Sequence, residues 1–357
     1  MGKSTLMNAL IGQDLCVATR RPQTTRHAIL GIESTDTCQL CLIDTPGVIG
    51  EPAYKLQEGM MEAVVGAFND ADVFLVVTDL FSTPIPDDKL FAKVQNSRKP
   101  VLVAINKVDL VDVVNPEENQ QEGRTVTVEE AVAKWRSLLP QAVAIIPVIA
   151  DDGMDNSGVT ALRTILLGGP DVPAAMRDLG RPIAGVLPQG TKMLSDDQAK
   201  QLLPFGPPLY DEEALTDRSE RFFASEIIRA SLFQTLKKEV PYCCEVRITS
   251  FREPRPHDRK KLIRVKANIL VERESQKPIV VGKGGETVKR VGIEARHELE
   301  DFLQSQVRER RLGCLFMPPT LVDTSWCIAQ VHLELNVKVE KDWRRDEEKL
   351  KKFGYLK

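Results

Sequence analysis

The sequence lacks the features that mark membrane-spanning and disulfide-stabilised proteins. No apolar run approaches the roughly 18 residues that a membrane helix needs. We therefore expect a soluble chain without an integral membrane segment, and peripheral membrane association stays open. The seven Cys follow no disulfide spacing, which indicates a reducing compartment, and we see no signal or transit peptide. Cys38 and Cys41 form a CxxC without a second pair at zinc spacing, so we interpret them as structural.

Charge is divided unevenly along the chain, although the net charge is only −3. Residues 218–357 contain 30 Lys and Arg against 21 Asp and Glu, a net +9. Residues 1–217 hold the remaining 18 and 30, a net −12. An acidic half followed by a basic half suggests that only the second half meets a polyanion.

The first 168 residues alternate between short apolar runs and amphipathic segments. This alternation is typical of an α/β domain with a doubly wound, mostly parallel sheet. Residues 169–215 are rich in Pro and Gly and lack periodicity, so we interpret them as a linker or insertion. The expected strands are His27–Ile32, Leu40–Ile43, Val73–Val77, Val101–Ile105 and Val143–Ile149, and the expected helices are Leu56–Phe68, Asp87–Gln95 and Val128–Leu138.

A partial phosphate loop opens the chain. Gly2-Lys3-Ser4-Thr5, followed by a helical stretch, matches the last half of the pattern GxxxxGK[ST]. In such a loop the backbone amides cradle phosphate, Lys3 neutralises the β/γ oxygens and the Ser4 hydroxyl binds Mg²⁺. The first glycine of the pattern and its feeding strand would lie before Met1. We therefore expect residues 1–357 alone to bind GTP poorly, and GKST alone is as readily a chance match.

Two further tetrapeptides each follow an apolar run. Residues 44–47 (DTPG) begin with Asp44, which can hold Mg²⁺ through water, and end with Gly47, whose amide can approach the γ-phosphate because no Cβ intervenes. Residues 106–109 (NKVD) end with Asp109, whose carboxylate can accept two hydrogen bonds that guanine offers and adenine does not. In order and at strand ends, these motifs predict a GTP site that also includes Asn106 and Lys107.

Residues 20–27 (RRPQTTRH) occupy the position of switch I, where a threonine closes onto Mg²⁺ when γ-phosphate is present. We favour Thr25 for this role, with Thr24 as the alternative; a solvated turn is the remaining reading. Val48 stands where Ras-like enzymes place a water-orienting glutamine, so hydrolysis should be slow and need a cation or a partner. The expected catalytic residues are Lys3, Thr25 and Gly47.

Residues 216–357 indicate an α+β domain that binds RNA. A helix from about Ser219, strands at 244–251 and 262–271, a glycine turn, a helix at 286–303, an irregular insertion near 305–327 and a strand at 328–339 follow one another. A glycine turn of the form GxxG within this order is the signature of a KH domain, here of type II, which clamps about four nucleotides. The expected RNA-binding residues are Ile279 and Val280 for bases, the turn Gly282, Lys283, Gly284 and Gly285, and Lys289 and Arg290 for phosphates.

The chain resembles the Era family of ribosome-assembly GTPases. The resemblance covers most of the chain outside about 110–145, 168–215 and 305–327, and rests on GKSTLMNALIG, RRPQTTRHAILGI, LIDTPG, INKVD, TDRSERFFASEIIRASL, EVPY, ILVERESQKPIVVGKGG, VKRVGIEAR and VHLELNVKV. It implies GTP hydrolysis with Mg²⁺, held by Ser4, Thr25 and Asp44, and coupled to binding the 3′ end of small-subunit rRNA. It implies a monomer that assists maturation of the small ribosomal subunit.

The sequence also departs from the family pattern. The missing upstream part would carry an asparagine thought to help K⁺ bind. Ile149 stands where the family usually has Ser, and the Ala150 amide is still expected to reach guanine O6. The insertions at 169–215 and 305–327 are unusual for a bacterial member, which favours a chloroplast or mitochondrion over a bacterial cytoplasm.

Three functions are weighed against one another. The first is a GTPase switch whose nucleotide state sets how the KH domain is presented to rRNA. The second is an RNA-binding protein whose first domain is a degenerate, nucleotide-free scaffold. The third, a tRNA-modifying relative that shares the GTPase half, does not fit the KH half.

Overall fold

The computed structural model describes residues 1–19, 21, 24–80, 89–112, 127–167, 202–254, 262–312 and 330–356. The chain packs as two compact units. Unit 1 contains Met1–Cys16, Ala28–Gly50 and Ala63–Thr216, and unit 2 contains Val17–His27, Glu51–Glu62 and Asp217–Lys357. The last crossing between the units follows Thr216, and two short segments of the first half of the chain belong to unit 2.

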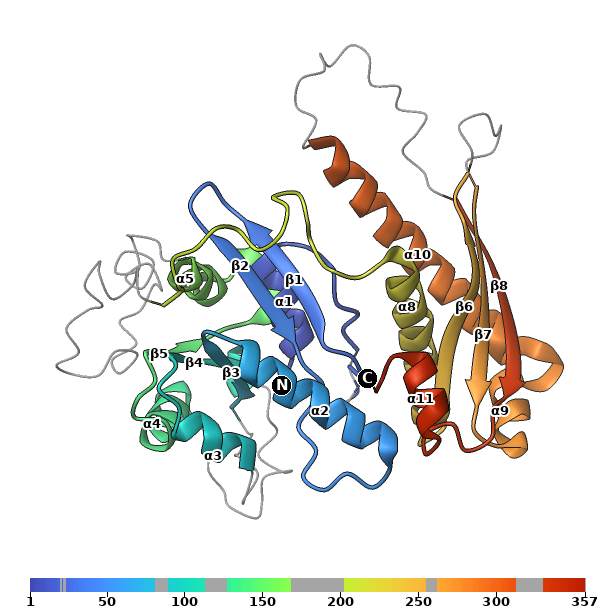
Figure 1. Cartoon of the computed structure of the whole chain (residues 1–357), viewed down its shortest axis with the longest axis horizontal. Coiled ribbons are helices and arrows are strands. Elements are labelled where there is room, and N and C mark those ends of the chain that lie inside the picture. Colours follow the sequence, from blue (N-terminus) through green and yellow to red (C-terminus); the bar gives the residue numbers. More distant parts are fainter. Residues whose placement is uncertain are drawn as a thin grey trace, which may run out of the picture. The chain divides into compact units, whose positions relative to one another are not determined.

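Unit 1 is an α/β domain (Figure 1). Its helices and strands alternate as the pattern predicted, with one further helix, α5, before the Pro- and Gly-rich stretch. The elements are α1 (Lys3–Ile11), β1 (Ile29–Ser34), β2 (Gln39–Asp44), α2 (Lys55–Asp70, which begins in unit 2), β3 (Phe74–Asp79), α3 (Lys89–Gln95), β4 (Val101–Asn106), η1 (Val108–Asp112), α4 (Val128–Leu138), β5 (Ala144–Pro147), η2 (Ala150–Asp155) and α5 (Ser157–Leu166).

Strands β3, β4 and β5 form a parallel sheet in that order, whereas β1 and β2 form a separate antiparallel pair. Every residue of β4 is buried. Successive side chains of a strand point to opposite faces, and β4 follows this rule: Leu102 and Ala104 join one core cluster, and Val101, Val103 and Ile105 join another. The first cluster includes side chains of α1 and α5, and the second includes side chains of α4. The central strand is thus covered by helices on both faces, as a doubly wound sheet requires.

The end of the predicted linker packs onto unit 1. Leu202 is buried in the first core cluster. The Ile32 N–H donates to the Leu215 carbonyl at 2.8 Å, and the Gln39 side chain bonds the backbone of Leu209 and Tyr210. Residues 202–216 are therefore tied to the edge of the β1–β2 pair. The rest of the linker, and residues 313–327 of the insertion predicted at about 305–327, lie outside the described residues.

Unit 2 is an α+β domain with a three-stranded sheet in the order β6-β7-β8. Strands β6 and β7 are antiparallel, and β7 and β8 are parallel. Helices α8 and α10 contact each other, and both pack on the sheet (Figure 1). The elements are α8 (Glu220–Thr235), η3 (Pro241–Cys243), β6 (Cys244–Arg252), β7 (Leu262–Val271), η4 (Glu274–Gln276), α9 (Lys277–Val281), η5 (Lys283–Gly285), α10 (Glu286–Leu312), β8 (Gln330–Val339) and α11 (Glu347–Phe353).

Helix α10 corrects one prediction. It runs through Leu312, whereas the sequence predicted a helix that ends at 303 and an irregular stretch from about 305. Residues 304–312 (QSQVRERRL) contain neither Gly nor Pro and are rich in helix-forming side chains, so helical hydrogen bonding continues after the apolar stripe has ended.

Among the described residues, no helix combines the length and apolar character that crossing a membrane requires.

Candidate nucleotide-binding and RNA-binding sites

The GKST segment forms the first turn of α1. Gly2 caps the helix with φ 78° and ψ 37°, a left-handed conformation that glycine adopts at no steric cost. A Cβ at Gly2 would lie 2.5 Å from the Nδ2 atom of Asn106. Lys3, Ser4 and Thr5 follow and are all partly exposed. The N-terminal amides of a helix present unpaired donors and a positive dipole end, so this turn has the properties of an anion site.

Ser4 and Asp44 meet at this helix start. The Ser4 hydroxyl donates a hydrogen bond to Asp44 Oδ2 at 2.6 Å, and Asp44 is buried at the end of β2. A hydroxyl and a carboxylate oxygen are the hard oxygen donors that Mg²⁺ prefers. The described residues contain no cluster of three or more His, Cys, Asp or Glu able to hold a metal ion. Mg²⁺ at this pair would therefore need ligands from another source, such as phosphate oxygens.

Asn106 connects three parts of the predicted site. Its side chain is buried at the end of β4, where Nδ2 donates to the Met1 carbonyl at 3.0 Å and Oδ1 accepts from the Ala150 N–H at 2.9 Å. Asn106 thus positions the start of α1 and the loop after β5. The Ala150 N–H has Asn106 as its acceptor, and its expected contact with guanine O6 stays a prediction.

The rest of the NKVD motif lies at the surface. Lys107 has φ 62° and its side chain is exposed, and Asp109 is exposed in the first turn of η1. A non-glycine residue with positive φ is uncommon, and here it turns the chain sharply at the end of β4. The carboxylate of Asp109 is therefore accessible to a ligand, as base recognition requires.

Gly47 and Val48 follow β2. Gly47 is partly exposed and the Val48 side chain is 36% exposed. An exposed valine offers neither donor nor acceptor to water. The expectation that this position cannot orient a nucleophilic water rests on the same chemistry.

Thr25 belongs to a different packing unit from the other two expected Mg²⁺ ligands, Ser4 and Asp44. It belongs to unit 2 together with Thr24, whose carbonyl accepts a hydrogen bond from Arg229 at 2.5 Å. Sequence reasoning missed the neighbours that hold this segment, Arg26 and His27, because their partners lie about 200 positions away.

The GxxG turn connects α9 to α10. Gly282 has φ 78° and ψ 170°, and a Cβ there would lie 2.2 Å from Thr287 Oγ1, so the backbone conformation and the close packing both require glycine. Gly284 and Gly285 also have positive φ, but a Cβ at either would meet nothing within 4 Å. The turn therefore presents open backbone at its tip, beside the exposed side chain of Lys283.

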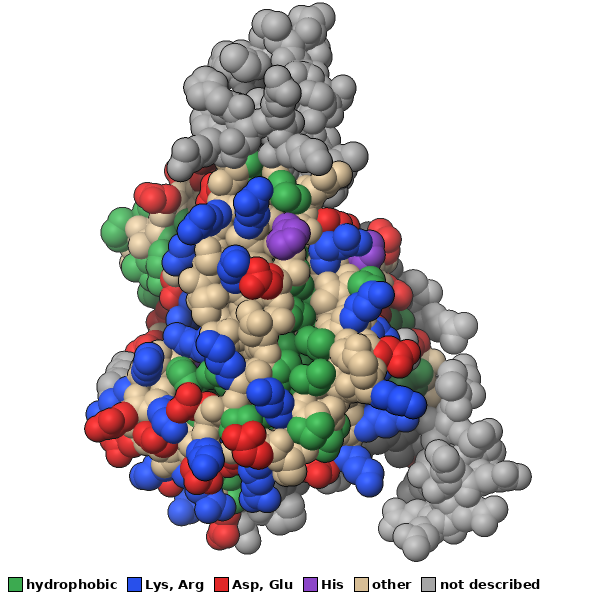
Figure 2. Space-filling model, turned by 90° about the vertical axis from the view of Figure 1, so that its right-hand side faces the viewer, with side chains coloured by type: hydrophobic (Ala, Val, Ile, Leu, Met, Phe, Trp, Pro, Cys, Tyr) green, Lys and Arg blue, Asp and Glu red, His purple; other side chains and the backbone are tan. Residues whose placement is uncertain are grey.

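An apolar strip lies beside this turn. Ile279 is 51% exposed and Ile293 of α10 is 47% exposed. Leu335 of β8 lies against α10, since a Cβ at Gly292 would be 3.6 Å from its Cδ1. Figure 2 shows hydrophobic side chains along the middle of this face with Lys and Arg on both sides. Lys289 and Arg290, both exposed, are among the basic residues of α10.

Val280 requires a correction. Its side chain is completely buried, so it packs in the core of unit 2 and cannot line a base groove. Ile293, one helical turn beyond Lys289, is the exposed apolar residue that sequence reasoning missed. The signal that could have found it is the i, i+4 spacing on one helix face.

Comparisons with known proteins agree on both halves. The family model of the 50S ribosome-binding GTPase matches residues 1–107, and the KH domain model matches residues 239–344. The chloroplastic GTPase ERA1 of Zea mays is 33% identical over 99% of this chain and 68% of its own length. The GTPase Era of Xylella fastidiosa (strain Temecula1 / ATCC 700964) is 32% identical over 99% of this chain and 93% of its own length.

Solved structures give the same result. Era in complex with MgGDPNP and nucleotides 1506–1542 of 16S ribosomal RNA matches with a TM-score of 0.70 and 28% identity, covering 100% of this chain and 95% of that chain. Aquifex aeolicus Era Y63A bound to GDP·AlF₄⁻ matches with the same TM-score, identity and coverage. The predicted fold, a P-loop GTPase domain followed by a KH domain, is confirmed. The chain belongs to the Era family of GTPases.

Proposed function

We propose that this protein is a GTP-hydrolysing switch that binds the 3′ end of small-subunit rRNA and assists maturation of the small ribosomal subunit. The observation that carries the proposal is the Ser4–Asp44 contact at the N-terminus of α1, in a chain whose relatives are GTPases. A solved relative was crystallised with both MgGDPNP and a 16S rRNA segment, and both corresponding domains are present here.

The nucleotide site is assigned residue by residue. The first turn of α1 would receive the phosphates, with Lys3 neutralising their charge and the amides of Gly2–Thr5 donating to them. Ser4 and Asp44 would hold Mg²⁺, joined by Thr25 when γ-phosphate is present. When bound, the metal ion would neutralise charge that develops on the phosphate oxygens. Asp109 would select guanine, and Asn106 would keep the loops around the base in register.

Hydrolysis should be slow without help. The exposed Val48 cannot orient water, so we propose that a cation or the RNA-bound partner supplies the missing stabilisation. K⁺ is the cation that we favour. Comparing GTP turnover in KCl with turnover in NaCl at equal ionic strength tests this part of the proposal.

RNA would bind across the GxxG turn. Lys283 and the open backbone at Gly284 would meet phosphates, whereas Ile279 and Ile293 offer apolar surface to unstacked bases. Lys289 and Arg290 add positive charge, which makes the affinity for RNA dependent on salt.

Relatives include chloroplastic and bacterial proteins, so we infer that the protein is located in a chloroplast or mitochondrion in a eukaryote and in the cytoplasm in a bacterium.

The main alternative is an RNA-binding protein with a nucleotide-free scaffold. Ser4→Ala decides between the two, because it removes the hydroxyl that would bind Mg²⁺ and leaves unit 2 unchanged. Binding of fluorescent GDP and GTP analogues and GTP turnover are measured for the chain 1–357 and for the same chain preceded by a strand and a GxxN segment.

If the protein is a GTP switch, the chain with the added strand and GxxN segment should bind both the GDP and the GTP analogue. Ser4→Ala should then lower GTP turnover at least tenfold. Thr164→Ala is the matched control, since that hydroxyl donates to the Thr160 carbonyl within α5. RNA binding without any nucleotide binding in either form of the chain would support the scaffold instead.

A further inference from the structure

The segment predicted to be switch I packs with the KH domain. Residues 17–27, here called the switch I segment, lie within the part of the sequence that matches the GTPase family model. By packing, however, they belong to unit 2, which also contains the KH domain. The chain leaves unit 1 after Cys16 and returns to it at Ala28. The segment therefore connects α1, whose first turn is the predicted phosphate site, to β1, whose Ile29 pairs with Asp44.

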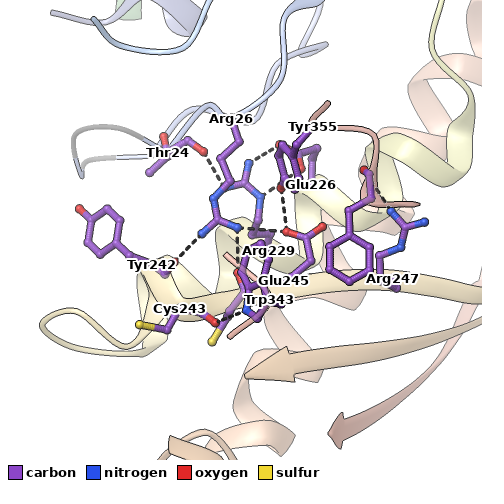
Figure 3. Close-up of polar contacts among 12 residues, drawn as sticks. Thr24, Arg26, Glu226, Arg229, Tyr242, Cys243, Glu245, Arg247, Trp343 and Tyr355 are labelled. Carbon is purple, nitrogen blue, oxygen red and sulfur yellow. Dashed lines mark hydrogen bonds and ion pairs between the residues drawn. The ribbon is translucent and has the colours of Figure 1, made fainter. Parts of the chain in front are cut away.

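Arg26 of this segment is held by several groups of unit 2 (Figure 3). Its guanidinium is buried and lies 5.6 Å from the centre of the Trp343 ring. Its hydrogen bonds include those to the Tyr242 carbonyl at 2.9 Å, the Cys244 carbonyl at 2.9 Å and Glu245 Oε2 at 3.1 Å. A planar guanidinium can satisfy several acceptors at fixed angles, which a lysine ammonium cannot reproduce.

The pocket for Arg26 is itself built from buried polar groups. The Tyr355 hydroxyl donates to Glu245 Oε2 at 2.7 Å, so this carboxylate receives two donors. Burial raises the pKa of Glu245, which Arg26 and Tyr355 oppose. Trp343 Nε1 donates to the Cys243 carbonyl at 3.1 Å, which fixes the ring beside Arg26. Such a network is stable only when every member has a partner.

The residues on either side of Arg26 are held as well. Arg229 forms an ion pair with the buried Glu226 and donates to the Thr24 carbonyl at 2.5 Å. The His27 ring stacks on Tyr355 with ring centres 4.3 Å apart. The proposed Mg²⁺ ligand, Thr25, thus lies between two residues whose positions are set by unit 2.

A second segment after the DTPG motif shows the same behaviour. Residues 51–62 also belong to unit 2. The Leu56 N–H donates to the Arg344 carbonyl at 3.0 Å, and the Arg344 guanidinium lies 4.7 Å from the centre of the Tyr54 ring. A Cβ at Gly59 would lie 2.7 Å from the Tyr355 carbonyl oxygen, so α2 meets the C-terminal segment at a glycine.

We propose that Arg26 is the positioning residue through which nucleotide binding and RNA binding influence each other. This inference rests on the proposed function of the chain as a GTP switch. Any movement that brings Thr25 onto Mg²⁺ must act on the peptide units that Arg26 and Arg229 hold in unit 2. The free energy of that movement is then shared between the nucleotide site and the KH domain, and such coupling is reciprocal.

The test measures this coupling in the full chain. The Kd of an rRNA 3′-end oligonucleotide is determined with excess GDP and with excess non-hydrolysable GTP analogue. The Kd values of GDP and of the analogue are each determined with and without RNA. In the unchanged protein, we expect the Kd of RNA to differ at least fivefold between the GDP-bound and the analogue-bound protein. RNA should change the ratio of the GDP and analogue Kd values by the same factor, because the coupling is reciprocal.

Two variants remove the anchor in different ways. Arg26→Met removes the charge. Arg26→Lys keeps a cation beside Glu245, but a single ammonium cannot reproduce the guanidinium's hydrogen bonds to the Tyr242 and Cys244 carbonyls and to Glu245. In both, the two RNA Kd values should converge to within twofold. Because Arg26→Met leaves Glu245 buried with only Tyr355 as partner, circular dichroism checks its fold, and Arg26→Lys decides if Arg26→Met fails to fold. Arg345→Met is the control, since its side chain is exposed in the same unit, and it should keep the full difference.

The outcomes separate this inference from the function on which it rests. A folded Arg26→Lys that keeps the full fivefold difference overturns the role of Arg26. Binding of both ligands to the unchanged protein without any mutual effect also overturns it. If the protein binds no nucleotide, either as residues 1–357 or preceded by the strand and GxxN segment, the proposed switch function itself fails.

Discussion

The side chain of Asn106 accepts a hydrogen bond from the backbone N–H of Ala150 at 2.9 Å, across 44 positions of sequence. The same side chain donates to the Met1 carbonyl at 3.0 Å. One buried amide therefore connects the end of β4 with the start of α1 and the loop after β5. These are the three places where the sequence predicted phosphate, base and loop contacts.

Asn106→Ala should weaken both the fold and nucleotide binding. It leaves a buried N–H and a carbonyl without their partner, and a buried unsatisfied group costs about 1–3 kcal/mol. We expect the free energy of unfolding to fall by about that amount in urea denaturation, and the affinity for a GTP analogue to fall at least tenfold. Asn96→Ala removes an exposed amide that bonds the Ala92 carbonyl at the end of α3, and should leave the affinity unchanged. Equal affinities of both variants would contradict the positioning role.

Asp109→Asn should change base preference. The exposed carboxylate is proposed to accept two hydrogen bonds from guanine, and loss of a charged contact of this kind costs roughly 2–5 kcal/mol. Asparagine offers a donor where xanthine offers a carbonyl, so preference should move from GTP to XTP. Competition binding with GTP, ATP and XTP measures it, with the exposed hairpin residue Asp36→Asn as control. An unchanged preference for GTP would remove Asp109 from the site.

The tip of the GxxG turn should contribute more to RNA affinity than to stability. Replacing Lys283 and Gly284 by Asp adds negative charge and bulk where open backbone is available. Binding of an rRNA 3′-end oligonucleotide should fall at least tenfold, about 1.4 kcal/mol. The thermal midpoint should fall modestly, because the φ of 61° at Gly284 strains any side chain, although Asp tolerates this conformation better than most residues. Affinity of the unchanged chain should also decline as salt rises. A folded variant that binds RNA as before would make the turn purely structural.

Gly282→Ala should mainly reduce the stability of the fold. Its Cβ would lie 2.2 Å from Thr287 Oγ1, and its φ of 78° disfavours any L side chain. We expect a loss of stability of about 1–3 kcal/mol, which is typical of strain at a special backbone conformation, seen in urea denaturation. Gly285→Ala also has a positive φ but meets nothing within 4 Å, so it separates backbone strain from steric overlap. If Gly282→Ala costs no more than Gly285→Ala, the contact with Thr287 is not what requires glycine.

Local pattern was sufficient for most of the fold. The boundaries of α4 and β7 were predicted to the residue, because each has a strong local signal. Helix α4 begins with a capping box between Thr127 and Glu130, and β7 alternates buried and exposed side chains. The Ser4–Asp44 contact was foreseeable because both belong to motifs with fixed chemistry.

The missed features depend on tertiary contacts that no local pattern reports. The polar segment RRPQTTRH gives no local sign that Arg26 is buried, yet its side chain is buried against partners more than 200 positions away in the sequence. Val280 reads as a groove residue beside the glycine turn, but its position on α9 directs it into the core. The roles assigned to the nucleotide- and RNA-binding side chains stay predictions, since they concern ligands.

His27 should make stability dependent on pH. Its ring stacks on Tyr355 and meets Phe222 edge-on with ring centres 5.4 Å apart. The pKa of His27 is lowered to about 4, chiefly because the ring is buried; Glu226 opposes this change, and Arg229, Arg218 and Arg26 contribute to it. The folded protein therefore keeps the imidazole neutral over a range in which the unfolded chain, with an ordinary pKa of about 6.5, binds a proton.

Because the unfolded chain binds more protons at His27 than the folded protein does, the free energy of unfolding should fall as the pH is lowered. The contribution of His27 is complete above pH of about 6.5 and is lost as pH falls toward about 4, at about 1.4 kcal/mol per pH unit. His27→Phe keeps an aromatic ring against Tyr355 but cannot titrate. Urea denaturation of both proteins at several values between pH 4 and 7 should therefore give free energies of unfolding whose difference changes with pH at about that slope. His297→Phe replaces an exposed histidine of α10 in the same unit and should follow the unchanged protein. A difference between the unchanged protein and His27→Phe that stays constant with pH would mean that His27 takes up its proton equally in both states.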